Sequence, residues 1–313
     1  MVVEFFAQLG DHTVRIVAIG ATVIGFVAGS LGCFAYLRRQ SLLGDVVSHA
    51  SLSGITLAFI LASLFADTVA KSMIVLIPGA IVIGSIAMLF AGAVVRRTKI
   101  KMDTALAVTL ALFFGGGITL MRVIQTGPFT DRQGLDSYIF GQAAAITIAD
   151  VYAILALGAI ALVLLAVFWK EFKLYTFDEG FAKSKGFSAR VLEPLLLSTI
   201  VIAVVIGLKA VGIVLMIAFV IAPPSAARQW THRLEGMVLL AGGVGAISGL
   251  LGTLTSGMLG DVPTGPVIVL FLTFFAVMSL FVAPKRGIVF RTVRMRRKRR
   301  QLIAQAQLQG ETT

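Results

Sequence analysis

Runs of apolar residues dominate this sequence and restrict the class of fold that it can adopt. Each run is long enough, or nearly so, to cross about 30 Å of hydrocarbon at 1.5 Å per residue. Because lipid offers the backbone no hydrogen-bond partners, we expect every run to be a helix. The nine runs lie at about Val14–Leu37, Leu42–Phe65, Met73–Val95, Thr104–Met121, Thr147–Trp169, Pro194–Leu208, Val211–Ala227, Met237–Met258 and Gly265–Ala283.

The composition places these helices in a membrane. Of the 313 residues, 58% are hydrophobic and only 13% are charged, whereas soluble domains carry about 25% charged residues. We therefore predict an all-α polytopic membrane protein with about nine transmembrane helices. Only Lys209 stands between the sixth and seventh runs, so the number is eight if they form one long, broken stretch.

The basic residues predict how the chain is oriented. If successive helices alternate in direction, all but five of the 27 lysines and arginines fall on one side, which the positive-inside rule assigns to the cytoplasm. We expect the N-terminus outside and the C-terminus inside. The domain prediction is a transmembrane domain over residues 1–287 and a basic cytoplasmic tail over 288–313. The tail's RMRRKRR run favours contact with anionic membrane lipids, and no nucleic-acid partner is expected.

An ionisable pair interrupts the second run. Asp45 and His49 are four residues apart, so a helix places both on one face. An aspartate at the centre of a membrane helix costs roughly 2.5–3.5 kcal/mol, and such residues are by default candidates for a functional site. A carboxylate and a neutral imidazole suit a divalent first-row metal. From residue types alone, a buried pair that only joins helices is an equal alternative.

Two loops are too long to be simple connections. The loop at residues 170–193 mixes charges with aromatic residues, and a short amphipathic helix around Phe177–Lys185 either contacts a cytoplasmic partner or lies on lipid headgroups. The loop at residues 122–146 is expected outside and contains Asp136. Together with Asp261, in a later outer turn, it is a candidate entrance that attracts cations, although turn chemistry alone also explains Asp261.

The sequence contains no G-x-x-x-x-G-K-[ST] motif that would cradle a nucleotide. We therefore predict that this chain is not an enzyme. If ATP energises transport, a separate subunit must hydrolyse it.

Five stretches identify a family. In order and spacing they resemble the permease subunits of bacterial ABC importers for manganese, zinc and iron. The similarity extends over roughly Leu31–Gly287. The stretches are LLGDVVSHASLSGITLAF, DTALAVTLALFFGGGITL, FDEGFAKSKGF, AVGIVLMIAFVIAPPSAAR and DVPTGPVIVL.

The resemblance implies a multi-pass protein of the bacterial cytoplasmic membrane that pairs with a second copy or a similar permease. It also implies cytoplasmic ATPase subunits that bind ATP, and an extracytoplasmic metal-binding protein. Asp45 and His49 would then contribute to the metal path. The residues that would couple to the ATPase are Phe177, Asp178, Phe181, Lys185 and Gly186.

The transported metal is the only ligand expected on this chain. Oxygen and imidazole ligands suit manganese, iron and zinc. The outer segment GLDSYIFGQAAA resembles the manganese and iron branch, so manganese is the first choice. The alternative function is a carrier that works alone, coupled to protons or ions, with Asp45 and His49 as a proton relay.

Overall fold

The computed structural model describes residues 11–40, 42–65, 72–129, 141, 146–259 and 262–283, and its regular elements in this part of the chain are helices. Eight of them are long and apolar enough to cross a membrane. The all-α prediction is therefore confirmed. The helices are α2 (His12–Leu37), α3 (Leu43–Phe65), α4 (Met73–Arg97), α5 (Met102–Thr126), α7 (Ile148–Val167), α8 (Trp169–Phe177), α9 (Glu179–Ser184), α10 (Ala189–Trp230), α11 (Leu234–Leu259) and α12 (Thr264–Val282).

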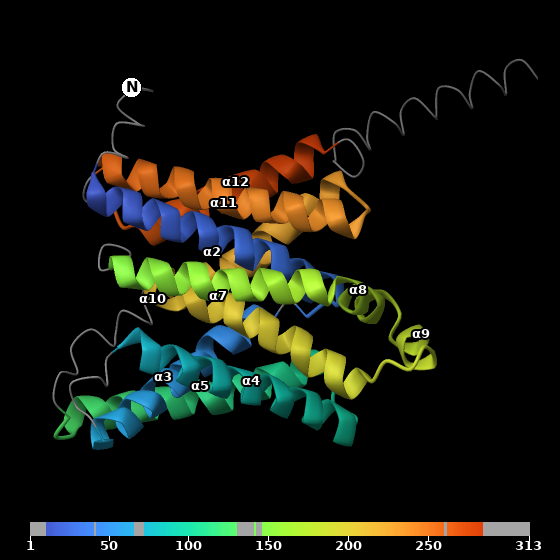
Figure 1. Ribbon diagram of the computed structural model, residues 1–313, viewed down its shortest axis with the longest axis horizontal. Helices are drawn as coiled ribbons and strands as arrows, with labels where there is room; N and C mark the ends of the chain where they lie inside the picture. The colour runs from blue at the N-terminus through green and yellow to red at the C-terminus, as the bar shows by residue number, and fades with distance from the viewer. Residues whose placement is uncertain are drawn as a thin grey trace, which may run out of the picture.

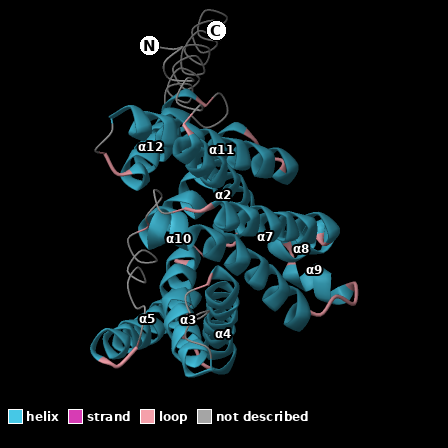
Figure 2. Cartoon of the chain, turned by 60° about the vertical axis from the view of Figure 1, so that its left-hand side comes forward, coloured by secondary structure: helices cyan, strands magenta, loops and turns pink. Residues whose placement is uncertain are grey.

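The long helices form two groups with α10 between them (Figures 1 and 2). One group contains α2, α11 and α12, and the other contains α3, α4 and α5. Helix α10 packs against members of both groups, and α7 packs on α2 and α10. Neither group is therefore independent of α10.

Small residues allow α2 and α11 to pack closely. A side chain at Gly25 would collide with the backbone of Gly245, and one at Gly29 would collide with Ala241. Gly249 faces Ala21 one turn further along, so the contacts repeat every four residues between antiparallel helices. Such small-residue stripes let membrane helices approach one another through van der Waals contact. The glycines of the eighth apolar run thus serve helix packing.

Helix α10 turns back on itself at Gly212, which has a φ of 79°. This left-handed backbone conformation is one that glycine adopts without steric cost. Gly207 lies against the Met216 thioether, although these residues would be about 13.5 Å apart along a continuous helix. The sixth and seventh apolar runs are therefore two antiparallel arms of one broken helix. Eight helices meet the criteria for crossing a membrane, and α10 contains both the sixth and the seventh apolar runs.

Most of the basic segments meet at one end of the bundle, which we call the α8 end. Arg38, after α2, contacts Tyr175 of α8, and Lys173 of α8 pairs with Glu235 at the start of α11 at 2.5 Å. Arg96, in the last turn of α4, pairs with Glu193 near the start of α10 at 3.2 Å. Alternating helices thus bring together the basic groups as predicted. That this end faces the cytoplasm stays a prediction.

A buried ion pair connects α7 to α10 at the end of the bundle opposite the α8 end. Asp150 completes a capping box with Thr147 at the start of α7, and its carboxylate also accepts a hydrogen bond from Lys209 at 2.7 Å. The Asp150 side chain is 6% exposed and that of Lys209 is 23% exposed. Lys209 lies three residues before Gly212, so the pair ties the turn of α10 to α7. Lys209, the only residue that interrupts the sixth and seventh apolar runs with a charge, therefore has a structural partner.

We expect Lys209→Met to lower the free energy of unfolding by about 3–5 kcal/mol, because it leaves the Asp150 carboxylate buried without its cation. Adding Asp150→Asn should recover much of the loss, since the buried charge is then removed as well. Unfolding in mixed micelles, followed by circular dichroism, measures both. Equal stability of the single and double variants would contradict this role for the pair.

Candidate metal site and docking surface

Asp45 and His49 lie side by side on the first turns of α3. His49 Nδ1 is 2.8 Å from Asp45 Oδ1 and 2.9 Å from the Asp45 carbonyl oxygen. The His49 ring also meets Phe114 of α5 edge-on, with 4.6 Å between the ring centres. The predicted i, i+4 arrangement is therefore present, and the imidazole orientation is restrained on two sides.

The pair lies well inside the bundle. Phe114 is the central residue of α5, so His49 stands at the middle of that helix. Gly44, just before Asp45, packs on Val220, which lies near the middle of the second arm of α10. From spacing alone, Asp45 stands only six residues, or about 9 Å, beyond Arg39. The pair lies deeper than this spacing indicates, because the start of α3 lies inside the protein.

The geometry leaves defined atoms for a ligand. Because Nδ1 faces two oxygens of Asp45, it is the nitrogen that carries the proton, and Nε2 keeps a lone pair for a metal. The Asp45 and His49 side chains are 28% and 21% exposed, so the protein does not enclose them. Among the described residues no group of three or more histidine, cysteine and acidic side chains is placed to hold a metal. Within this part of the chain, Asp45 and His49 are therefore a pair of candidate ligands without a third beside them.

The Ser51 and Ser53 hydroxyl groups bond to backbone carbonyls, whereas the buried Ser48 hydroxyl has no partner among the described residues. Ser51 donates to the Val47 carbonyl at 2.7 Å within α3. Ser53 donates to the Phe113 carbonyl of α5, where Gly117 makes room for the close approach. These bonds fix α3 against α5 and thereby hold His49 beside Phe114.

The predicted docking residues form an exposed apolar tip at the α8 end (Figure 1). Phe177 and Phe181 are 57% and 48% exposed. The amphipathic segment is two short helices and not one, because Asp178 leaves the helical conformation and caps α9 by accepting a bond from the Phe181 amide at 2.8 Å. Gly186, with a φ of 86°, closes α9. Its amide bonds to the Lys183 carbonyl, which completes a C-terminal glycine cap.

Lys185 contributes differently from the phenylalanines, since its ammonium lies 5.5 Å from the centre of the Phe181 ring. Asp178 and Gly186 thus shape the tip, whereas Phe177 and Phe181 provide its apolar surface. The predicted outer residues Asp136 and Asp261, and the basic tail, lie outside the described residues.

Sequence reasoning did not single out Asp150, or the pairing of Arg38 with Tyr175. The T-x-x-D pattern of Thr147 and Asp150 is a capping signal that was available. Arg38 and Tyr175 are separated by 137 positions, and no local pattern pairs residues so far apart. Their contact emerges only from the packing of α8 on α2.

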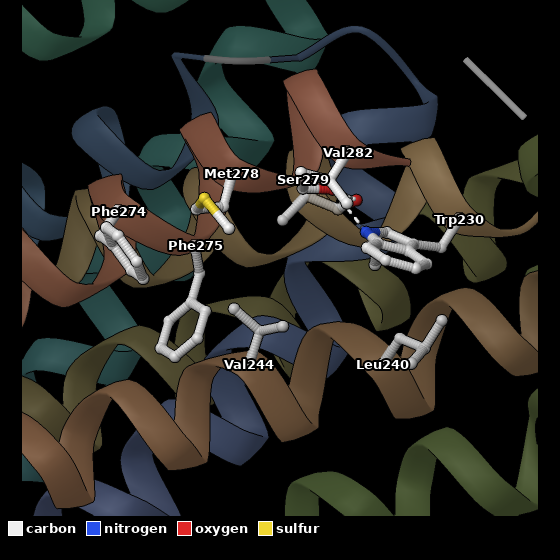
Figure 3. Close-up of a pocket in the computed structure, with 10 residues that line it drawn as sticks. Trp230, Leu240, Val244, Phe274, Phe275, Met278, Ser279 and Val282 are labelled. Carbon is white, nitrogen blue, oxygen red and sulfur yellow. Dashed lines mark hydrogen bonds between the residues drawn. The ribbon is translucent and has the colours of Figure 1, made fainter. Parts of the chain in front are cut away.

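An apolar groove of about 410 Å³ lies elsewhere, between α10, α11 and α12 (Figure 3). Its side chains include Leu240, Val244 and Phe275. The indole of Trp230 donates to Ser279 at 2.7 Å, and Ser279 donates to the Ala226 carbonyl at 2.7 Å. The polar groups of the groove therefore bond to one another, and it has no carboxylate or imidazole to bind a metal.

Comparisons with known proteins agree with this architecture. The zinc transport system membrane protein TroC of Treponema pallidum is 42% identical over 92% of this chain and 94% of its own. The manganese transport system membrane protein MntC of Bacillus subtilis is 40% identical over 95% of this chain and 67% of its own. The structure of PsaBC from Streptococcus pneumoniae in complex with Fab matches with a TM-score of 0.80 and 32% identity, over 95% of this chain and 100% of that chain.

The model of the ABC 3 transport family matches residues 11–283, which include α2 to α12 and the Asp45–His49 pair. A helical membrane bundle without a nucleotide-binding motif is what the membrane subunit of such a transporter requires. The chain therefore belongs to the ABC 3 transport family, as a multi-pass membrane permease.

Proposed function

We propose that this permease imports a divalent transition metal, with manganese first and zinc or iron as alternatives. The observation that carries the proposal is the Asp45–His49 pair, an oxygen and an imidazole ligand half-open at the middle of a helical bundle. Relatives at 40% and 42% identity are described as manganese and zinc transport proteins. Both metals accept this donor set, so the pair alone does not select between them.

We infer that a second permease copy completes the metal site. Two ligands from one chain hold a metal weakly, whereas a two-fold axis beside α3 would supply four. The partial exposure of Asp45 and His49 leaves them accessible to such a partner. A weak, shared site suits passage, because the metal must leave as readily as it binds. An extracytoplasmic metal-binding protein is expected to deliver the ion.

We also infer that cytoplasmic ATPase subunits dock on the α8–α9 tip. An exposed aromatic cluster at the end of a membrane bundle offers the anchor residues that dominate protein interfaces. Contact with lipid headgroups is the alternative. Alternating access then follows: ATP-driven movement of the tip opens the inner side after the metal has reached Asp45 and His49.

We expect His49→Ala to reduce manganese uptake by more than about tenfold, since losing even an outer partner of a metal ligand commonly costs 10–100-fold. Uptake of manganese, zinc and iron is measured in vesicles that contain the permease, the ATPase and the binding protein. His12→Ala is the matched control, because His12 is exposed at the far end of α2. Undiminished uptake by an Asp45→Ala/His49→Ala variant would refute the metal path.

We expect Phe181→Ala to weaken binding of the ATPase by about tenfold or more, because truncating an interface anchor typically costs at least 2 kcal/mol. Co-purification and titration of the ATPase in detergent measure this. Phe274→Ala, which removes an exposed ring on α12, should leave the affinity unchanged. If α9 only contacts lipid, both variants will bind the ATPase equally.

The rival is a carrier that works alone, and reconstitution separates it from the proposed function. Vesicles that contain only the permease should import no manganese when a proton gradient is imposed across their membrane. Gradient-driven uptake in the absence of ATPase would favour the carrier and would make the α8–α9 tip unnecessary for transport.

A further inference from the structure

Helix α8 is attached to the last turns of α2 through aromatic packing. The Phe34 ring meets Trp169 and Phe172 edge-on, with centroid separations of 6.1 and 6.2 Å. Phe34 and Phe172 are fully buried. Any displacement of α8 must therefore either carry the end of α2 along or break this packing.

Arg38 extends the same attachment. Its guanidinium lies over the Tyr175 ring at 4.4 Å, and its Nη2 donates to the Tyr175 hydroxyl at 3.3 Å. Tyr175 is only 3% exposed. Burial raises the pKa of Tyr175 above its ordinary value, so the phenol stays neutral. The contact is thus a cation–π interaction with a hydrogen bond, formed by a half-buried arginine on a buried ring.

A short, hydrogen-bonded turn connects Arg38 to the candidate metal site. The Gln40 amide bonds to the Ala35 carbonyl at 3.0 Å, and the Leu43 amide bonds to the Gln40 carbonyl at 3.1 Å. Arg39 has a φ of 58°, a conformation that residues with side chains rarely adopt. Asp45 follows within the first turn of α3. Arg38 is therefore only seven residues along the chain from a proposed metal ligand.

Unpartnered polar atoms concentrate around this connection. Six buried side-chain oxygen or nitrogen atoms have no hydrogen-bond partner within the described residues, and four of them belong to the α2–α3 turn or to α8. These four are Arg38 Nη1, Gln40 Oε1, Glu171 Oε2 and Thr176 Oγ1. Buried polar atoms are normally paired, and an exception calls for a reason. The side chains of the junction are therefore not joined to one another by a complete hydrogen-bond network.

We propose that Arg38 and Tyr175 are positioning residues that transmit the movement of α8 to the start of α3, and thereby move Asp45 and His49. Neither side chain touches the metal. Arg38 acts through the α2–α3 turn, and Tyr175 acts through Arg38. This proposal rests on the proposed function, because it assumes that an ATPase moves the α8–α9 tip while metal occupies the pair.

The test measures how many manganese ions enter per ATP hydrolysed by the reconstituted permease, ATPase and binding protein. Arg38→Gln should preserve ATP hydrolysis but lower this ratio by about tenfold, in keeping with the loss of one half-buried cation–π contact. Arg38→Lys keeps the charge over the ring and should recover part of the ratio. Tyr175→Phe keeps the ring and should reduce the ratio less than Arg38→Gln.

Arg97→Gln is the matched control, because it removes an exposed arginine at the same end and should leave the ratio unchanged. A merely structural role for Arg38 would lower the amount of assembled importer, so hydrolysis and uptake would fall together and the ratio would stay constant. A wild-type ratio in Arg38→Gln overturns the proposal. Absence of ATP-dependent uptake by the wild type would instead refute the proposed function.

A second measurement applies if Arg38→Gln does not assemble. A spin label on Leu42→Cys, which is 37% exposed in the wild type, reports the start of α3. The only native cysteine, Cys33, is buried and should not react. The label's spectrum should change on nucleotide binding in otherwise wild-type importer, and that change should be reduced in Tyr175→Phe and Arg38→Lys. If the spectral change in both variants is as large as in the wild type, the proposal is overturned.

Discussion

The reversal of α10 at Gly212 is the constraint on which the rest of the bundle depends. A residue with a β-carbon would be strained at this φ, and Gly141 and Gly265 pack beside the same turn. The returning arm presents Val220, against which Gly32 of α2 and Gly44 of α3 both pack. Because Gly44 packs on Val220, α3 begins inside the protein. Without the returning arm, the first turn of α3 would have no protein surface at that depth.

That depth explains why an ionisable pair is tolerated within an apolar helix. The aligned peptide dipoles leave a partial positive charge at the start of α3, which favours a nearby carboxylate. Asp45 therefore lies where the helix itself stabilises a negative charge, and it in turn orients His49. The protein thus creates a polar position within the bundle by starting a helix there. A continuous helix through the same region would offer no such stabilisation to a carboxylate.

Sequence reasoning succeeded where the controlling physics is local. Hydropathy located the spans, and i, i+4 spacing paired Asp45 with His49. It also identified the exposed Phe177 and Phe181. It could not decide whether two runs separated by Lys209 were one span or two, because that depends on a single backbone dihedral angle at Gly212. The depth of Asp45 was likewise inaccessible, since the packing of Gly44 on Val220 joins segments about 176 positions apart.

The two ends of the bundle differ in how deeply their ion pairs are buried. At the far end, one carboxylate on Asp150 bonds both the cap of α7 and Lys209 beside the turn of α10. At the α8 end, charged pairs such as Lys173 with Glu235 are partly exposed. Breaking the first ion pair would leave a buried charge without a partner, whereas rearranging the second exchanges one weak, exposed pair for another. Conformational change is therefore cheaper at the α8 end, which is also the end that bears the apolar tip. An importer driven from that end would keep its opposite end fixed while the start of α3 moves.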